Sequence, residues 1–287
     1  MGFIKRGILG DGDAGDMDGE RRRTANPYDL EPINVGGNYY VAVAGSEGTH
    51  LITVTNPDSL QPNNHAGVRN IGKVTDIDKY VLSGTTYVAI IYEASKAIQL
   101  YSINGNALAF GEHRIDTTRL LDPSGLATYS TATGTYAVIT ANKSTGTITE
   151  GGSGAGRVNI LNLPAPSTKP SFVSQIQDNG SLALQSPSDV AHYSKGNNHY
   201  AVVTSTHDNG IQILNITTPN SPSATGQLTD TANLLLDGAH AVDVYSIGNK
   251  HYAVVIQKST NEGGIQIIDI TDPNRPTGAG KIQSNDT

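Results

Sequence analysis

An acidic, glycine-rich stretch near the N-terminus is the first place where residue types and spacing could do chemistry. Residues 11–20 hold five acids, among them Asp11, Asp13, Asp16 and Asp18. Glycine permits the sharp turns that let a loop wrap carboxylate oxygens, which are hard ligands, around Ca²⁺. The spacing does not match an EF-hand loop. The sequence therefore predicts a weak calcium site here, with a solvated acidic linker as the alternative.

A second set of acids stands at a fixed distance before a repeated tyrosine. Eleven residues before each of five tyrosines, a three-residue segment begins, and acids fill six of the ten outer positions of these segments. If the segments begin the innermost strands of a repeated sheet, their side chains meet at one mouth and attract a cation. The residues predicted to bind Ca²⁺ there are Asp29, Asp76, Asp78 and Asp243. Alternatively, an aspartate at a strand start accepts hydrogen bonds from turn amides.

Paired carboxylates could also do catalysis. Many glycosidases hydrolyse their substrates with two acids that face each other across a cleft. Glu31, Asp78 and Asp243 could supply such a pair, but nothing around them distinguishes an acid from a nucleophile. The sequence has neither a Gly-x-Ser-x-Gly nor a His-Glu-x-x-His motif. We therefore predict that the protein is not an enzyme and has no catalytic or cofactor-binding residues apart from the calcium candidates.

Three histidines form a further candidate metal set. His192, His207 and His240 are expected near the end of the sheets where the acids lie, and three imidazoles can hold Zn²⁺. No closely spaced pair of ligands marks this set, so three unrelated surface histidines are the alternative. His199 and His251 directly precede repeated tyrosines and are expected at the opposite end.

The structure that must position these residues is a repeat of strands. Each copy contains a tyrosine followed by three small or β-branched residues, and the spacings between copies are 47, 49, 64 and 52 residues. The tyrosines are Tyr40, Tyr87, Tyr136, Tyr200 and Tyr252. A strand-rich period of this length is typical of a β-propeller. We expect these tyrosines to lie in the core between blades.

Turn residues and alternation predict four antiparallel strands in each repeat. A turn containing glycine or asparagine precedes each tyrosine, as tight hairpins require. An apolar third strand follows, most clearly at 210–216 and 264–270, and then a short fourth strand. The sequence thus predicts an all-β fold, a closed β-propeller of about five four-stranded blades over residues 28–287. The predicted first strands begin near Asp29, Asp76, Gly125, Asp189 and Ala241.

The same register predicts which side chains are buried between blades. The apolar positions chosen in the second and third strands of the last two repeats are Val202, Ile213, Val254 and Ile267. Because each blade of a propeller is covered on both faces by neighbouring blades, we expect all four to be buried.

The last repeat resembles the LVIVD-repeat family. The resemblance rests on the string YAVV at 252–255, the string GIQIIDITDPNRP at 264–276, and Leu236-Asp-Gly-Ala before them. It extends more weakly over roughly residues 28–287. Members are propeller repeats of bacterial and archaeal proteins, often secreted or attached to the cell surface, with no agreed activity. The resemblance implies a propeller fold and an extracellular or cell-surface location.

Charge and composition exclude some classes of function. The net charge is −7 and the one basic run is Arg21-Arg22-Arg23, whereas phosphate binding needs clustered basic residues, so we predict no nucleic-acid partner. There is no cysteine and therefore no disulfide framework. No apolar run is long enough to span a membrane. The first ten residues are too short and interrupted for a signal peptide, so either the protein is cytoplasmic or the numbering starts after processing.

Two segments outside the regular repeats could carry interactions. Residues 1–27 form an N-terminal segment in which Phe3 to Leu9 reads as a strand. This strand could pair with the outer edge of the fifth blade in the same chain or, as we predict, with an edge of a neighbouring copy by β-augmentation. The longest loop, Ala141 to Arg157, is either a recognition arm or a passive extension.

We predict a non-enzymatic extracellular or cell-surface propeller that acts as a binding and assembly module. Its predicted partners are protein, either further copies of itself or other surface proteins, and a glycan is a further candidate. The alternative functions are a calcium-dependent carbohydrate-binding protein and a five-bladed, glycosidase-like enzyme that uses the channel carboxylates.

Overall fold

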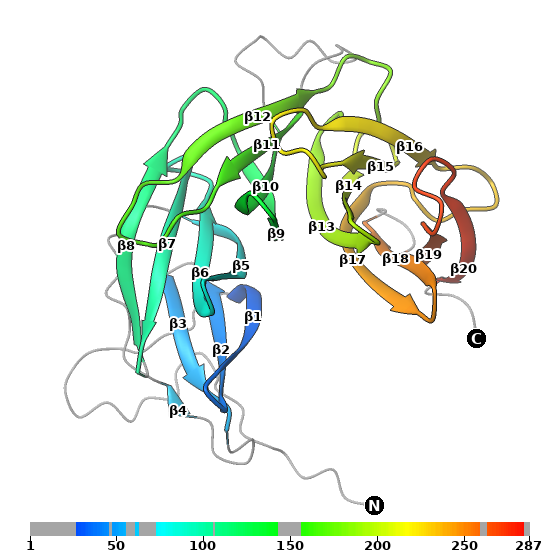
Figure 1. The fold of residues 1–287 in the computed structure, drawn as a ribbon. Helices are drawn as coiled ribbons and strands as arrows, with labels where there is room; N and C mark the ends of the chain where they lie inside the picture. The colour runs from blue at the N-terminus through cyan, green and yellow to red at the C-terminus, as the bar shows by residue number, and fades with distance from the viewer. Residues whose placement is uncertain are drawn as a thin grey trace, which may run out of the picture. The chain divides into compact units, whose positions relative to one another are not determined.

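The computed structural model describes residues 27–45, 48–55, 61–62, 73–105, 107–142, 156–258 and 263–283. In this part of the chain there are twenty strands and no helix. The strands form five four-stranded antiparallel sheets, which are the blades of a five-bladed β-propeller (Figure 1). The predicted fold class and blade number are therefore confirmed. Closure of the ring stays a prediction.

The chain divides into two compact units. The first holds blades one and two together with residues 164–170. Blade one consists of β1 (Pro27–Val35), β2 (Asn38–Gly45), β3 (Gly48–Thr53) and β4 (Gln61–Pro62). Blade two consists of β5 (Val74–Leu82), β6 (Thr85–Tyr92), β7 (Ala97–Asn104) and β8 (Ala107–Ile115). In both blades the strands pair in chain order.

The second unit holds blades three, four and five. Blade three consists of β9 (Pro123–Thr131), β10 (Gly134–Ala141), β11 (Arg157–Asn162) and β12 (Ser171–Gln177). Blade four consists of β13 (Pro187–Lys195), β14 (Asn198–Ser205), β15 (Gly210–Asn215) and β16 (Ser223–Thr229). Blade five consists of β17 (Ala239–Ile247), β18 (Lys250–Gln257), β19 (Gly264–Asp269) and β20 (Thr277–Gln283). The first strands β9, β13 and β17 contact one another in turn.

The repeated tyrosine fixes the register of the first hairpin in every blade. In four blades it lies directly opposite a second tyrosine on the first strand, and in blade one it lies opposite Ile33. In blade four the rings of Tyr193 and Tyr200 are 5.2 Å apart between centroids. Two first-strand hydroxyls also reach the next blade: Tyr129 donates to the Ile216 carbonyl and Tyr193 to the Ile270 carbonyl, both at 3.2 Å. These two hydroxyls join blades at backbone carbonyls. Of the repeated tyrosines predicted to lie in the core, Tyr40, Tyr136 and Tyr200 are buried, whereas Tyr87 and Tyr252 are half-buried.

A register shift near the start of each first strand gives a second link between blades. In blade four the first-strand residue inside this shift is Ser188, and in blade three the shift includes Ser124 and Gly125. Ser124 donates to the Pro187 carbonyl at 2.7 Å, and Ser188 donates to the Ala239 carbonyl at 3.1 Å. Each acceptor is the first residue of the next blade. A bulge leaves one residue out of the ladder, and here that residue bonds to the neighbouring sheet.

The predicted burial is observed for the chosen residues of blade four but not for those of blade five. Val202 and Ile213 are fully buried against a cluster that includes Val242, Val255 and Ile268 of blade five. The prediction for Val254 and Ile267 is wrong, since both are only half-buried. They occupy the same strand positions in blade five, but their face points away from blade four, and no described residue of the second unit buries it.

This difference gives a direct test of the register. Replacing Ile213 with Ala should lower the free energy of unfolding by about 2–5 kcal/mol, because the vacated space is enclosed on all sides. The same change at Ile267 should cost about 1 kcal/mol or less, because that side chain is partly solvated already. Denaturant unfolding of the two variants measures both. Equal losses would contradict the burial difference.

Candidate functional site

The acids at the starts of the first strands accept backbone hydrogen bonds. Asp29 Oδ2 accepts from the Ile77 amide at 3.1 Å, and Asp189 Oδ2 accepts from the Val242 amide at 2.8 Å. In both cases the donor belongs to the first strand of the next blade in the same unit. These two carboxylates therefore join neighbouring blades, which is a structural use of a charged side chain.

The other acids of this set also have partners. Asp76 and Asp243 each accept from the amide of the following residue, both at 2.7 Å. Glu31 forms an ion pair with Lys79, whose ammonium group also donates to the Pro32 carbonyl at 3.0 Å. The alternative interpretation of the sequence, in which such acids accept backbone amides, thus describes the observed contacts.

These contacts show where some of the predicted calcium-binding residues lie, but they do not test whether the residues bind Ca²⁺. Asp11, Asp13, Asp16 and Asp18 lie outside the described residues. Asp29, Asp76, Asp78 and Asp243 lie on first strands, the first three in one unit and the last in the other. Within the described residues, no three His, Asp or Glu side chains are grouped so that they could hold a metal ion.

The predicted grouping of histidines is wrong. His192 Nε2 lies 3.1 Å from Nδ1 of His199, which was expected at the opposite end of the blade. Their rings stack with centroids 5.3 Å apart, and the Tyr129 ring of blade three lies 5.5 Å from that of His192. His192 stands beside Tyr193 in the tyrosine half of the first hairpin, because the register places it well past the strand start.

This pair is held uncharged by its surroundings. Burial, with a smaller contribution from the neighbouring His199, lowers the pKa of His192 to about 4. Burial also lowers the pKa of His199. Two stacked imidazoles against a tyrosine therefore behave as part of the inter-blade core rather than as metal ligands.

The linkers between blades build a second kind of polar structure. In the second unit, the linkers 116–122, 178–186 and 230–238 lead into blades three, four and five. Each buries a leucine at the equivalent position, which is Leu120, Leu184 or Leu236, and the last linker also buries Leu235. A side-chain amide from the third strand of the blade that the linker enters also bonds to each linker. Asn159 Nδ2 donates to the Arg119 carbonyl, Gln212 Oε1 accepts from the Ala183 amide, and Gln266 Oε1 accepts from the Leu235 amide. The linker, the third strand and the end of the fourth strand meet at one place, which we call the blade corner.

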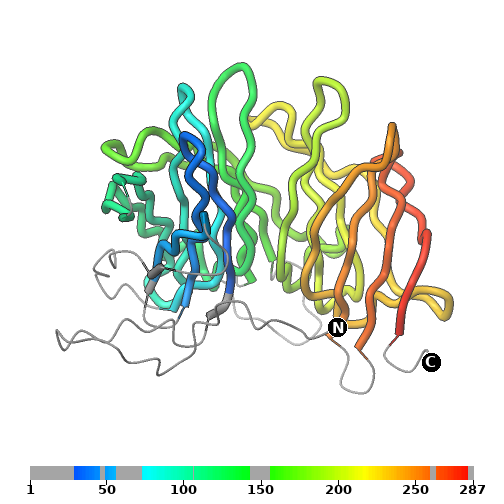
Figure 2. Tube along the Cα trace, turned by 90° about the horizontal axis from the view of Figure 1, so that it is seen from below, coloured from blue at the N-terminus to red at the C-terminus, as the bar shows by residue number. Residues whose placement is uncertain are grey.

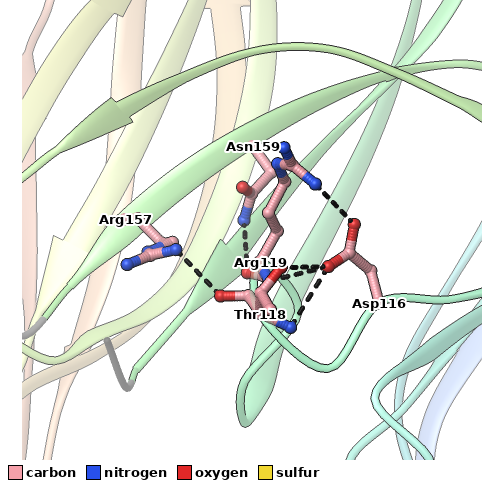
Figure 3. A network of polar contacts seen from close by, with 5 residues as sticks. All are labelled: Asp116, Thr118, Arg119, Arg157 and Asn159. Carbon is pink, nitrogen blue, oxygen red and sulfur yellow. Dashed lines mark hydrogen bonds and ion pairs between the residues drawn. The ribbon is translucent and has the colours of Figure 1, made fainter. Parts of the chain in front are cut away.

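The corner of blade three is filled by charged side chains (Figure 3). Asp116 Oδ1 accepts from the amide of Arg119 and from the amide and hydroxyl of Thr118, at 2.9, 3.2 and 2.8 Å. Its Oδ2 accepts from Arg119 Nη1 at 3.2 Å. Burial alone raises the pKa of Asp116, but these hydrogen bonds outweigh it and hold the pKa at about 2. The Arg119 guanidinium also lies 4.3 Å over the Phe172 ring.

Arg157 completes this corner. Its side chain is 7% exposed, and its Nη1 donates to the Thr118 carbonyl at 2.9 Å. Arg157 is the first residue of β11, the position that Gly210 occupies in β15 and Gly264 in β19. In Figure 3 it reaches the linker from the strand beside it. Its Nε and the Oδ1 of Asn159 are buried without a hydrogen-bond partner in the described chain. The network therefore locks the linker to blade three.

The corner of blade four is open instead. A cavity of about 450 Å³ lies there, bounded by residues 180–183 of the linker, by Asp208 and Asn209, and by Gln227, Thr229 and Asp230. Gly210 leaves no side chain at the position of Arg157, and a Cβ there would lie 2.4 Å from the Leu228 carbonyl oxygen. Blade four therefore cannot close its corner as blade three does.

Blade five closes the same corner with apolar side chains. Leu235 Cδ1 lies 2.9 Å from where a Cβ on Gly264 would be, and Leu234 Cδ2 lies 2.5 Å from that of Gly278. The residue equivalent to Leu235 in blade four is Ala183, since each donates its amide to the third-strand glutamine. Because Ala183 and Gly210 are both small, the corner of blade four stays unfilled. The sequence analysis missed this cavity, although comparison of the linkers would have shown the alanine.

Among the described residues of the second unit, the exposed large hydrophobic side chains all lie on blade five. Ile256, Ile265 and Ile282 lie side by side across β18, β19 and β20. They are 49%, 38% and 65% exposed, and Tyr245 and Ile247 on β17 are 39% and 65% exposed. Figure 2 shows the four strands of this blade side by side, with β20 at its edge. We call these five residues the exposed face of blade five.

Comparison with known proteins adds information on the fold alone. The sequence matches no protein-family model and no curated protein, so the LVIVD resemblance stays a prediction. Similar solved structures include a functionally unknown protein from Desulfotomaculum acetoxidans DSM 771, with 14% identity and a TM-score of 0.59 over 88% of this chain and 70% of that one. A protein from Lactobacillus plantarum has 13% identity and a TM-score of 0.60 over 92% and 73%. A thermostable family-43 glycoside hydrolase has 10% identity and a TM-score of 0.54 over 89% and 93%.

The histidine pair predicts how stability depends on pH. Folding lowers the pKa of His192 from 6.5 to about 4, so between these values the unfolded chain binds more protons than the folded chain. Stability should therefore fall as the pH is lowered from 6.5 to 4. Replacing His192 with Gln should flatten this slope by up to about 1.4 kcal/mol per pH unit, the limit for one proton. Thermal unfolding across this range measures it, and the exposed His207, replaced with Gln, is the control. Identical slopes for all three proteins would refute the buried neutral pair.

Proposed function

We propose that this protein is a non-enzymatic binding and assembly module of the β-propeller class, which associates with a second copy through the exposed face of blade five. One observation carries the proposal. Blade four packs on blade five through these strand positions, whereas in blade five the same positions are exposed. Contiguous apolar surface of this kind commonly marks a site of protein–protein contact.

Comparison of the two blades supports this use of the face. Ile211 of blade four is fully buried, and the equivalent Ile265 is 38% exposed. Tyr193 is 6% exposed, and the equivalent Tyr245 is 39% exposed. The chemistry of the face is thus that of a surface which packs against another sheet.

Blade one exposes an apolar side chain at a position through which blade five packs on blade four. Leu30 stands where blade five has Val242, one residue after the start of the repeated segment. Val242 is 8% exposed because it packs on blade four, whereas Leu30 is 60% exposed. Two copies could therefore associate head to tail, with the exposed face of blade five of one copy on blade one of the next. Such a heterologous contact builds a ring or an open chain.

The contacts of the acids favour binding over catalysis. Asp29 and Asp189 bond the next blade, and Glu31 is paired with Lys79. Among the three acids that could supply a catalytic pair, Glu31 is therefore engaged in an ion pair, which makes it a poor general acid or nucleophile. The likeness to a glycoside hydrolase concerns the fold, and a fold does not fix a function. The extracellular or cell-surface location and the use of other surface proteins as partners belong to the same proposal.

The oligomeric state tests it. Light scattering coupled to size exclusion, over a range of concentrations, should show a mass above that of the monomer. Ile265→Asp should abolish this association, since a charge in an apolar contact is costly to desolvate. Val81, which is 51% exposed on blade two, offers the control Val81→Asp. A monomer at every concentration, with Ile265→Asp less stable than Val81→Asp, would mean that the face is covered within one chain and would overturn the proposal.

A further inference from the structure

The cavity in the corner of blade four has the features of a ligand site. It is lined by residues from three segments of one blade and its linker, all within the second compact unit. The corners of blades three and five, which have the same construction, are filled. An open corner in blade four is therefore a departure from the repeat, and function on repeated scaffolds resides in such departures.

Two carboxylates line this cavity, and each is anchored through one oxygen. Asp208 Oδ2 accepts from the Gln185 amide at 2.6 Å and from the Ser205 hydroxyl at 3.1 Å. Asp230 Oδ1 accepts from the Leu236 amide at 2.9 Å. The second oxygens, Asp208 Oδ1 and Asp230 Oδ2, accept no hydrogen bond from any described residue. Each carboxylate is thus fixed in place and keeps one acceptor available.

Two side-chain amides are anchored in the same manner. Asn209 Oδ1 accepts from the Gly238 amide at 2.9 Å. Gln227 Oε1 accepts from the Ala183 amide at 3.2 Å. Asn209 Nδ2 and Gln227 Nε2 donate to no residue in the described part of the chain. The cavity therefore offers two acceptors and two donors, all on side chains that the backbone already positions.

This mixture of groups selects a class of ligand. An anion is disfavoured because two carboxylates and no Lys or Arg line the cavity. A simple cation would use the acceptors and leave the amide donors unused. A hydroxyl group donates and accepts at once, so adjacent hydroxyls match a carboxylate next to an amide. The half-buried Leu182 offers a small apolar surface beside them.

We infer that the blade-four cavity binds a polyhydroxylated, uncharged ligand, a saccharide unit, through Asp208, Asn209, Gln227 and Asp230. Anchored side chains lose little conformational freedom on binding, which favours association. The volume of about 450 Å³ lies within the range of small-molecule sites. A free sugar and a terminal sugar of a glycan present the same hydroxyls, so both are sources of this ligand.

Titrations of the full chain test the inference. The probes are glucose, galactose, mannose and arabinose, their methyl glycosides, and two charged comparators, methylamine and acetate. Backbone amide NMR shifts should move at residues 180–183 and 208–210 with at least one saccharide, and not with acetate. A methyl glycoside that binds as well as its free sugar would show that a glycan terminus can be the source. Shifts with methylamine alone would overturn the inference, as would the absence of shifts with every saccharide.

Matched variants locate the site. Ala183→Leu copies the residue with which blade five fills its own corner, so it should abolish the shifts without unfolding the chain. Asp230→Asn keeps an oxygen for the Leu236 amide and should weaken binding about tenfold, the worth of one hydrogen bond to a charged group. Asp272→Asn, an exposed change outside the cavity, is the control. Unchanged saccharide affinity in Ala183→Leu would refute the site.

The outcome is independent of the assembly proposal. The cavity and the exposed face of blade five share no residue, so Ala183→Leu should leave the oligomeric mass unchanged. Conversely, Ile265→Asp should leave the saccharide-induced shifts unchanged. If Ala183→Leu proves too unstable to assay, Gln227→Leu removes a donor from an exposed side chain and serves in its place.

Discussion

Both faces of a propeller blade are apolar, so each blade gains stability from every neighbouring sheet that covers one of its faces. In this chain the cover is supplied by blades of the same repeat. The tyrosine pairs, the first-strand serines and Asp189 all bond from one blade to the next within the second unit. Polar side chains that resemble an active site in the sequence therefore serve the contact between sheets, where a buried backbone amide needs an acceptor.

The linkers at the rim of each blade are subject to the same constraint. A linker must place a leucine in the core while its backbone stays hydrogen-bonded, and a glutamine or asparagine from the third strand supplies that bond. The side chains around this bond are less constrained. Arg157 fills the corner in blade three and Leu235 fills it in blade five. In blade four the pair Ala183 and Gly210 leaves the corner open. Variation at a tolerant position thus produced the cavity.

The two proposals place different interactions on different parts of the scaffold. Association uses a flat apolar sheet face, whose contribution scales with the area removed from water. Ligand binding uses a concave polar site, whose contribution depends on the positions of a few anchored groups. A propeller can hold both because its rigid sheets keep the corner and the outer face apart. A module that joins copies and holds a saccharide in each would bind a multivalent glycan with an avidity that a single site lacks.

The sequence by itself determined the fold class, the five blades and the register of each first hairpin. These follow from local features, the turn residues and the fixed distance to the tyrosine, which act over about a dozen residues. The tertiary structure alone decided that Asp29 and Asp189 bond the next blade, that His192 meets His199, and that Ile267 is half-exposed while Ile213 is buried. It alone also revealed the cavity beside Ala183. Each of these depends on which neighbour covers a face, and the neighbour is set by packing between residues far apart in the chain.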